Sequence, residues 1–295
     1  MDCPKLQSAI VIMTISHISD TARWVALYRA RESEREDALF QDPYARRLAG
    51  AEGEALVRRL EAEMQGDWPV IVRTAVMDEI ILRLVASGVR RVLNLAAGLD
   101  ARPWRLPLPS NVRWIDADLP GILDHKLRVL AGEPLRCYYK PARVDLADAG
   151  QRREFLGQLG AGTGETLVIT EGLLGYLDSD LAATLAGELH SMRGSRWWLT
   201  DLASPDLLSM AAKERVRMDS VNDTILRFAP DAAPAWFAGL GWSEAEFHST
   251  VHEGILLGRT PDLDEFWEHL PPARTPSRME RIWRFAGIVL LEAVR

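Results

Sequence analysis

The stretch VLNLAAGLDARPWRL (residues 92–106) starts with a short apolar run and continues into a turn that contains a single glycine, Gly98. A short apolar run that is bounded by turn residues is typical of a buried strand. Loops that cradle a pyrophosphate follow the pattern G-x-G-x-x-G, whereas this turn reads A-A-G-L-D. Pro103 and Pro107 argue against a long helix directly after the turn. The stretch therefore predicts a buried strand that leads into a ligand loop without a pyrophosphate cradle.

Strand-like and helix-like segments alternate from this stretch onward. The strand-like segments are residues 90–96, 112–120, 138–145, 165–170 and 195–205, and the helix-like segments between them are residues 120–132, 151–160 and 178–192. This alternation indicates an α/β fold with a doubly wound, mainly parallel sheet. Residues 242–251 and 285–294 have the composition of two further strands, and we expect them to add an antiparallel edge. The complete sheet would then have seven strands.

The chain before residue 89 is predicted to be helical. Apolar residues recur there at three- to four-residue spacing, as in residues 72–85, and Gly88 is placed to end a helix. We predict an N-terminal helical cap over residues 1–88, packed on an α/β core over residues 89–295. The alternation loosens at about residues 206–240, which we interpret as an insertion that forms part of a substrate pocket.

The amino-acid composition of the chain argues against several classes of binding partner. The net charge of −7 argues against a dedicated nucleic-acid binder, because such proteins normally carry a basic face. No apolar segment reaches the length of a membrane helix. Cys3 and Cys137 form no CxxC pair, and the six histidines show no metal-ligand spacing. We expect a cytoplasmic protein with a small-molecule partner, no nucleic acid, no membrane and no metal, and the oligomeric state stays open.

The residues that follow the strands are the candidates for a ligand site. In doubly wound sheets, ligands bind outside the carboxyl ends of the strands. Asp118 ends the second predicted strand, 20 residues after Gly98, which is the position of a carboxylate that binds a ribose diol. Asp116 lies on the same strand face and is the alternative. Asp145 and Leu146 follow the third strand, where they could bind an adenine, although Asp145 could also cap the next helix. Adenosine without phosphates points to S-adenosylmethionine (SAM).

Six segments resemble, in order, the leucine carboxyl methyltransferase-like family, in the bacterial branch that is similar to the tetracenomycin polyketide O-methyltransferase. They cover about residues 20–200. The segments are TARWVALYRARESEREDALFQDPYARRLAG, VRTAVMDEII, GVRRVLNLAAGLDARPWRL, VRWIDADLPGILDHK, RVDLAD and LVITEGLLGYL. The resemblance implies a Rossmann-like, SAM-dependent methyltransferase whose product is S-adenosylhomocysteine.

The resemblance also implies roles for particular side chains. Arg73 would pair with the methionyl carboxylate of SAM, and Glu171 would face its amino group or the loop that orders it. Arg29 would add a second basic contact, or it would form only a surface salt bridge. Gly98 would line the methionyl part, Asp118 would bind the ribose, and Asp145 with Leu146 would hold the adenine.

Ala96 departs from the family pattern. The family reads G-A-G in this loop, and Ala96 replaces the first glycine. If the backbone there needs a positive φ or a close approach to the methionyl group, the extra methyl group would weaken SAM binding.

The predicted function is transfer of a methyl group from SAM to a carboxylate or acidic hydroxyl of a small, polyketide-like natural-product intermediate. No histidine among the strand-end residues offers an obvious general base, which favours an acceptor that is already ionised. We assign no catalytic residue, but Tyr176 could contact the acceptor. The alternatives are methylation of a protein C-terminal carboxylate, a non-methylating step such as cyclisation, and a binding module that has lost SAM.

Overall fold

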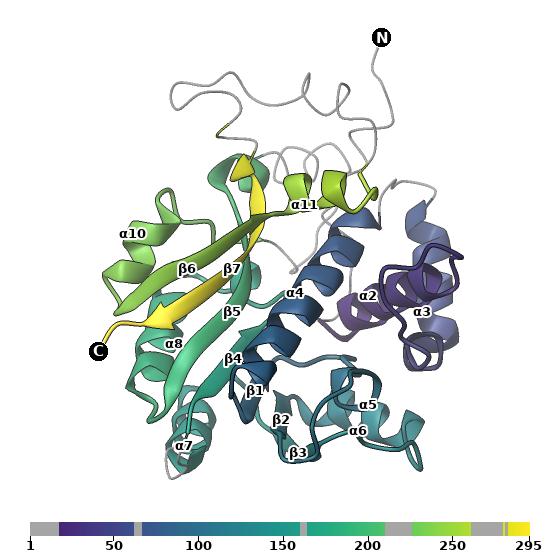
Figure 1. Ribbon diagram of the computed structural model, residues 1–295, viewed down its shortest axis with the longest axis horizontal. Coiled ribbons are helices and arrows are strands. Elements are labelled where there is room, and N and C mark those ends of the chain that lie inside the picture. Colours follow the sequence, from purple (N-terminus) through teal and green to yellow (C-terminus); the bar gives the residue numbers. More distant parts are fainter. Residues whose placement is uncertain (1–17, 62–66, 160–163, 210–225, 261–279, 281–282) are drawn as a thin grey trace.

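The computed structural model describes residues 18–61, 67–159, 164–209, 226–260, 280 and 283–295, and its centre is one seven-stranded sheet (Figure 1). The strand order is β3-β2-β1-β4-β5-β7-β6. The strands are β1 (Arg91–Leu95), β2 (Arg113–Asp118), β3 (Tyr138–Arg143), β4 (Thr166–Thr170), β5 (Ser195–Ala203), β6 (Trp242–Ser249) and β7 (Ala286–Ala293).

Five neighbouring strands run parallel, and β7 is antiparallel to both β5 and β6. The predicted fold class, with its antiparallel edge, is therefore confirmed. The strand order reverses between β1 and β4, and ligands of doubly wound sheets bind beside such a reversal. The loop of residues 96–101 leaves β1 at this point.

Helices cover both faces of the sheet. Because side chains alternate along a strand, Val92 of β1 packs with α4 (Trp68–Ala86), whereas its neighbour Leu93 packs in the cluster of α8 (Ser179–Ser191). The second face also holds α7 (Ala149–Leu159) and α10 (Ala233–Ala238), and α4 lies across the first face (Figure 1).

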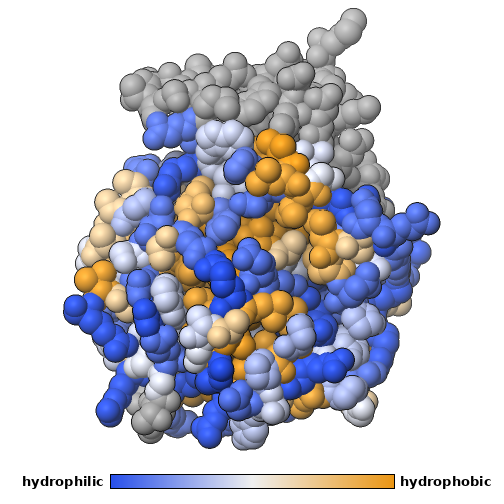
Figure 2. Space-filling view, in the orientation of Figure 1, coloured by the Kyte–Doolittle hydropathy of each residue, from blue (hydrophilic) through white to orange (hydrophobic). Residues whose placement is uncertain are grey.

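A third cluster packs α2 (Ile18–Ser33) and α3 (Ala45–Glu61) against α6 (Pro120–Val129) and the β1 loop. Figure 2 shows the face that carries α4, where hydrophilic side chains surround apolar patches near its middle and near α11 (Thr250–Leu256). The division into a cap and a core stays a prediction, and residues 210–225 of the predicted insertion lie outside the described residues.

Several predicted boundaries were wrong. The third strand ends at Arg143, before Asp145. The last parallel strand ends at Ala203, before the predicted end at residue 205. Ser249 accepts a hydrogen bond from the N–H of His252 and caps α11, so Thr250 and Val251 are helical where a strand was predicted. In each case a turn or cap interaction decides the boundary, which the apolar pattern alone does not locate. The short α5 (Arg102–Arg105) agrees with the prediction of no long helix there.

Candidate functional site

The loop after β1 has a strained conformation. Ala96 has a φ of 52° and is the one non-glycine residue with positive φ in the described part of the chain. Its N–H donates to the carbonyl of Ala117 at 2.8 Å, and this conformation costs an alanine about 1–2 kcal/mol. Gly98 has a φ of 49°, and a Cβ there would lie 3.3 Å from the Cβ of Ala22. Both positions therefore favour glycine, and only Gly98 has it.

Asp118 at the end of β2 reaches this loop. Its Oδ2 accepts from the N–H of Gly98 at 2.6 Å, and its Oδ1 accepts from the N–H of Leu119 at 2.7 Å. Burial raises the pKa of the Asp118 carboxyl, and these backbone donors oppose the rise. The carboxylate remains partly exposed beside the loop, with lone pairs left for further donors.

Asp116 is enclosed, so it does not present a carboxylate to a ligand. Its Oδ1 accepts from Trp114 Nε1 at 2.8 Å, and its Oδ2 accepts from Lys126 Nζ at 2.8 Å and Tyr139 Oη at 2.9 Å. The residue has an exposed fraction of 0%. The geometry thus separates the two candidate acids, and only Asp118 borders the loop.

Asp145 and Leu146 follow β3 in a turn and are half-exposed. The Asp145 carboxylate accepts from the N–H of Ala147 at 2.9 Å and does not cap α7. Asp148 is the cap instead, because its Oδ1 accepts from the N–H of Gln151 at 2.9 Å. The capping role considered for Asp145 is therefore wrong.

A cluster of opposite charges lies where α4 faces the ends of β4 and β5. Arg73 donates from Nε to Glu171 at 3.0 Å and from Nη1 to Asp201 at 2.9 Å. Asp201 also accepts from the N–H of Gly172 at 2.6 Å, so it fixes the turn after β4. These two bonds leave other donors of the Arg73 guanidinium available for an anion.

Arg102 joins this cluster to the β1 loop. Its Nη1 donates to Asp100 at 2.8 Å and to Glu171 at 2.7 Å, and its Nε donates to Asp78 at 2.6 Å. Burial opposes the ionisation of Glu171, but Arg102 and Arg73 outweigh it and lower the pKa of the carboxyl to about 2. Glu171 is therefore an anion throughout the neutral range.

Two further predicted site residues, Arg29 and Tyr176, lie near this network. Arg29 donates to Asp42 at 3.0 Å and to the carbonyl of Leu99 at 2.7 Å. Burial raises the pKa of Tyr176, whose phenol also interacts electrostatically with Arg73 and Asp201.

Two members of this network were not predicted. Arg102 lies in the opening stretch, where the only signal was a basic residue two positions after Asp100. Asp201 comes two residues after the apolar residues 197–199 of its strand, a position that marks it for inspection without assigning a role.

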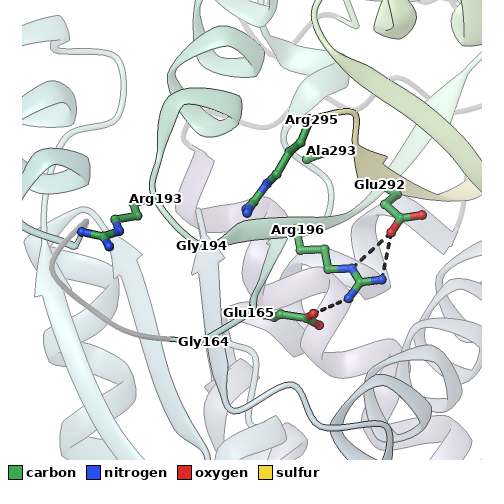
Figure 3. A pocket seen from close by; sticks show the side chains of 8 residues that line it. All are labelled: Gly164, Glu165, Arg193, Gly194, Arg196, Glu292, Ala293 and Arg295. Atoms are coloured by element: carbon green, nitrogen blue, oxygen red, sulfur yellow. Dashed lines mark hydrogen bonds and ion pairs between the residues drawn. The ribbon is translucent and has the colours of Figure 1, made fainter.

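A cavity of about 550 Å³ opens at the other end of the sheet, beside the amino ends of β4 and β5 (Figure 3). Arg196 lies there between Glu165 and Glu292 and pairs with both. Ligands of doubly wound sheets bind at the opposite ends of the strands, so we interpret this cavity as a charged surface groove.

In the ranges that the structure describes, no group of three His, Cys, Asp or Glu residues could hold a metal ion.

Over the same ranges, no helix has the length and apolar character required to span a membrane.

Known proteins show the same fold. The crystal structure of a Thermobifida fusca protein, which is named as a methyltransferase, superposes on this fold with a TM-score of 0.55 at 17% identity. The match covers 85% of this chain and 93% of that one. A DUF574 family protein from Streptomyces avermitilis gives a TM-score of 0.53 at 14% identity, covering 95% and 98%.

Sequence comparisons carry functional information. Residues 22–190 match the model of the family described as leucine carboxyl methyltransferase. A protein of Streptomyces coelicolor, named for SAM-dependent methyltransferase activity, is 34% identical over 258 residues, with 81% of this chain and 87% of that protein covered. A similarly named protein of Streptomyces avermitilis is 33% identical, with 88% and 91% covered.

Together, the sheet and these matches define a SAM-dependent methyltransferase, a transferase whose cofactor is SAM. Within that class, the chain belongs to the leucine carboxyl methyltransferase family.

Proposed function

We propose that this protein transfers the methyl group of SAM to a carboxylate or acidic hydroxyl of a small, natural-product-like acceptor. The observation that supports this most directly is that the carboxylates at the ends of β4 and β5 are both held by cations, so neither is a free general base. Glu171 is bound by two arginines and has a pKa near 2, and Asp201 is bound by Arg73 and a backbone N–H. An ionised oxygen needs no base, whereas an ordinary alcohol does.

The residues fit SAM through their donor and acceptor chemistry. Arg73 has guanidinium donors left for the methionyl carboxylate, and Glu171 offers negative charge to the amino group. Asp118 has acceptor capacity for the ribose hydroxyls beside Gly98.

We assign the adenine to Asp145 and Leu146, which offer an acceptor and an apolar side chain after β3. Ala96 would line the methionyl part.

SAM supplies an electrophilic methyl carbon on a sulfonium. An acceptor oxygen would form a bond to that carbon, and the electron pair of the broken carbon–sulfur bond would stay with sulfur. The contribution of the protein is alignment and exclusion of water. We assign Tyr176 a contact with the acceptor, because its phenol interacts electrostatically with Arg73 and Asp201 and its raised pKa keeps it a hydrogen-bond donor.

The test begins with calorimetry of SAM and S-adenosylhomocysteine, and absence of binding to both in folded protein would contradict the cofactor site. Mass spectrometry then follows methyl gain in a panel of aromatic carboxylates, phenols of graded acidity, aliphatic alcohols and peptides with a free C-terminus. We expect methylation of the small carboxylates and the acidic phenols only. Preference for the peptides would identify a protein C-terminal carboxylate as the methyl acceptor. Methylation of the alcohols would contradict the argument that the site has no general base.

A further inference from the structure

Two buried cations bind consecutive carbonyls of the β1 loop. Arg29 of α2 donates from Nη2 to the carbonyl oxygen of Leu99 at 2.7 Å, and Lys126 of α6 donates from Nζ to that of Asp100 at 3.2 Å. The exposed fractions of the two residues are 6% and 0%. Helices far apart in the chain thus converge on one short backbone segment.

Each cation also has a buried carboxylate partner. Arg29 pairs with Asp42 at 3.0 Å, and Lys126 pairs with Asp116 at 2.8 Å. A buried ion pair adds little net stability, because the cost of removing both charges from water offsets their attraction. The carbonyl contacts therefore suggest a second task for both pairs, namely to hold the backbone in one conformation.

The contacts fix the peptide between Leu99 and Asp100 from both sides. Its carbonyl accepts from Arg29, while its N–H donates to the carbonyl of Ala97 at 3.0 Å. Rotation of this peptide would break both bonds at once. Because Asp118 holds the N–H of Gly98 as well, groups of the protein itself hold the loop, which lowers the ordering cost of binding.

We propose that Arg29 and Lys126 are positioning residues for the cofactor loop. By holding the carbonyls of Leu99 and Asp100, they keep Gly98 in the conformation that SAM binds, without contacting SAM themselves. The effect on SAM affinity rests on the cofactor site proposed above, whereas the effect on the loop does not.

Arg91 provides a matched control. It is a partly buried cation that holds the carbonyls of Leu159 and Arg193 at 2.9 and 3.0 Å, at the amino end of β1 and away from the loop. Replacing it should lower stability and leave SAM affinity unchanged. A general packing role for buried cations would make all three positions behave alike.

The experiment compares Arg29→Met, Lys126→Met and Arg91→Met in the full chain. Three properties are measured: urea unfolding, SAM affinity by calorimetry, and amide hydrogen exchange of residues 97–101 in the free protein. For Arg29→Met and Lys126→Met we expect loop exchange and the Kd for SAM each to rise about tenfold, as loss of one charged hydrogen bond predicts. Arg91→Met should change neither, and Arg29→Lys, which keeps the charge, should restore part of the affinity.

Unchanged loop exchange in both variants, or equal losses of SAM affinity at all three positions, would overturn the inference. If the methionine variants do not fold, Arg29→Lys and Asp42→Asn weaken the same contacts more gently and are measured in the same way. Absence of SAM binding by the unaltered protein would contradict the cofactor site, while the exchange measurement would still decide the positioning role.

Discussion

The Oδ2 atom of Asp118 accepts a hydrogen bond from the N–H of Gly98 at 2.6 Å, which joins the end of β2 to the loop after β1. One carboxylate thus fixes the loop and borders the space beside it. Asp118→Ala should weaken SAM binding by at least tenfold, because one or two hydrogen bonds to a charged acceptor are lost. Calorimetry measures this, and Asp124→Ala, which removes an exposed acid of α6, is the control.

A variant of Asp116 separates the roles of the two acids. Asp116→Asn leaves Lys126 without its buried partner, so we expect a large loss of stability in urea unfolding. If Asp118→Ala binds SAM normally, the assignment of the ribose to Asp118 is wrong.

Ala96 provides a test of backbone strain. Ala96→Gly should raise the free energy of unfolding by about 1 kcal/mol, because glycine adopts a positive φ without the steric cost that alanine has. The neighbouring Ala97 lacks a positive φ, so Ala97→Gly should lower stability by about the same amount. Urea unfolding of both variants measures the pair of effects. Equal destabilisation by the two substitutions would show that Ala96 is not strained.

The sequence was sufficient to predict which segments form strands and that the sheet is mainly parallel, because apolar runs and turn residues mark buried strands between amphipathic helices. The position of Asp118 beside Gly98 also followed from their spacing. The local reason is simple: parallel neighbours such as β1 and β2 end at the same edge of the sheet.

The network around Arg102 could not be predicted in this way. Its partners Asp78, Asp100 and Glu171 come from three separate segments, and no local pattern records which of them a buried guanidinium will reach. The enclosure of Asp116 by Lys126 and Tyr139 likewise depends on packing between α6 and β3. Long-range contacts of this kind appear only once the fold is known.

Glu171 should make the stability of the protein depend on pH in the acidic range. Its pKa is about 2 in the folded protein, against 4.5 for an unperturbed glutamate. The resulting stabilisation, about 3 kcal/mol, is fully present above pH 4.5 and is lost as the pH falls through 2. Glu171→Gln should therefore lower stability at pH 7 and flatten the dependence between pH 5 and 2. Urea unfolding across this range measures both effects, and an unchanged slope would show that other carboxyls dominate.

His248 should produce the opposite dependence. Burial lowers its pKa, but Glu246 and Glu253, whose oxygens lie 3.1 and 3.0 Å from its ring nitrogens, outweigh burial and raise it. Protonated His248 then bridges β6 and α11, and the stabilisation is present below pH 6.5, the value of an unperturbed histidine. It is lost as the pH rises through the raised pKa.

His248→Gln should remove this component, so that the loss of stability on going from pH 6 to pH 8 becomes smaller than in the unaltered protein. NMR titration of the His248 ring protons provides the direct measurement, with His190, whose Nε2 donates to the backbone carbonyl of Val294, as the comparison. A His248 pKa at or below 6.5 would contradict the bridge, because it would mean that burial outweighs the two carboxylates.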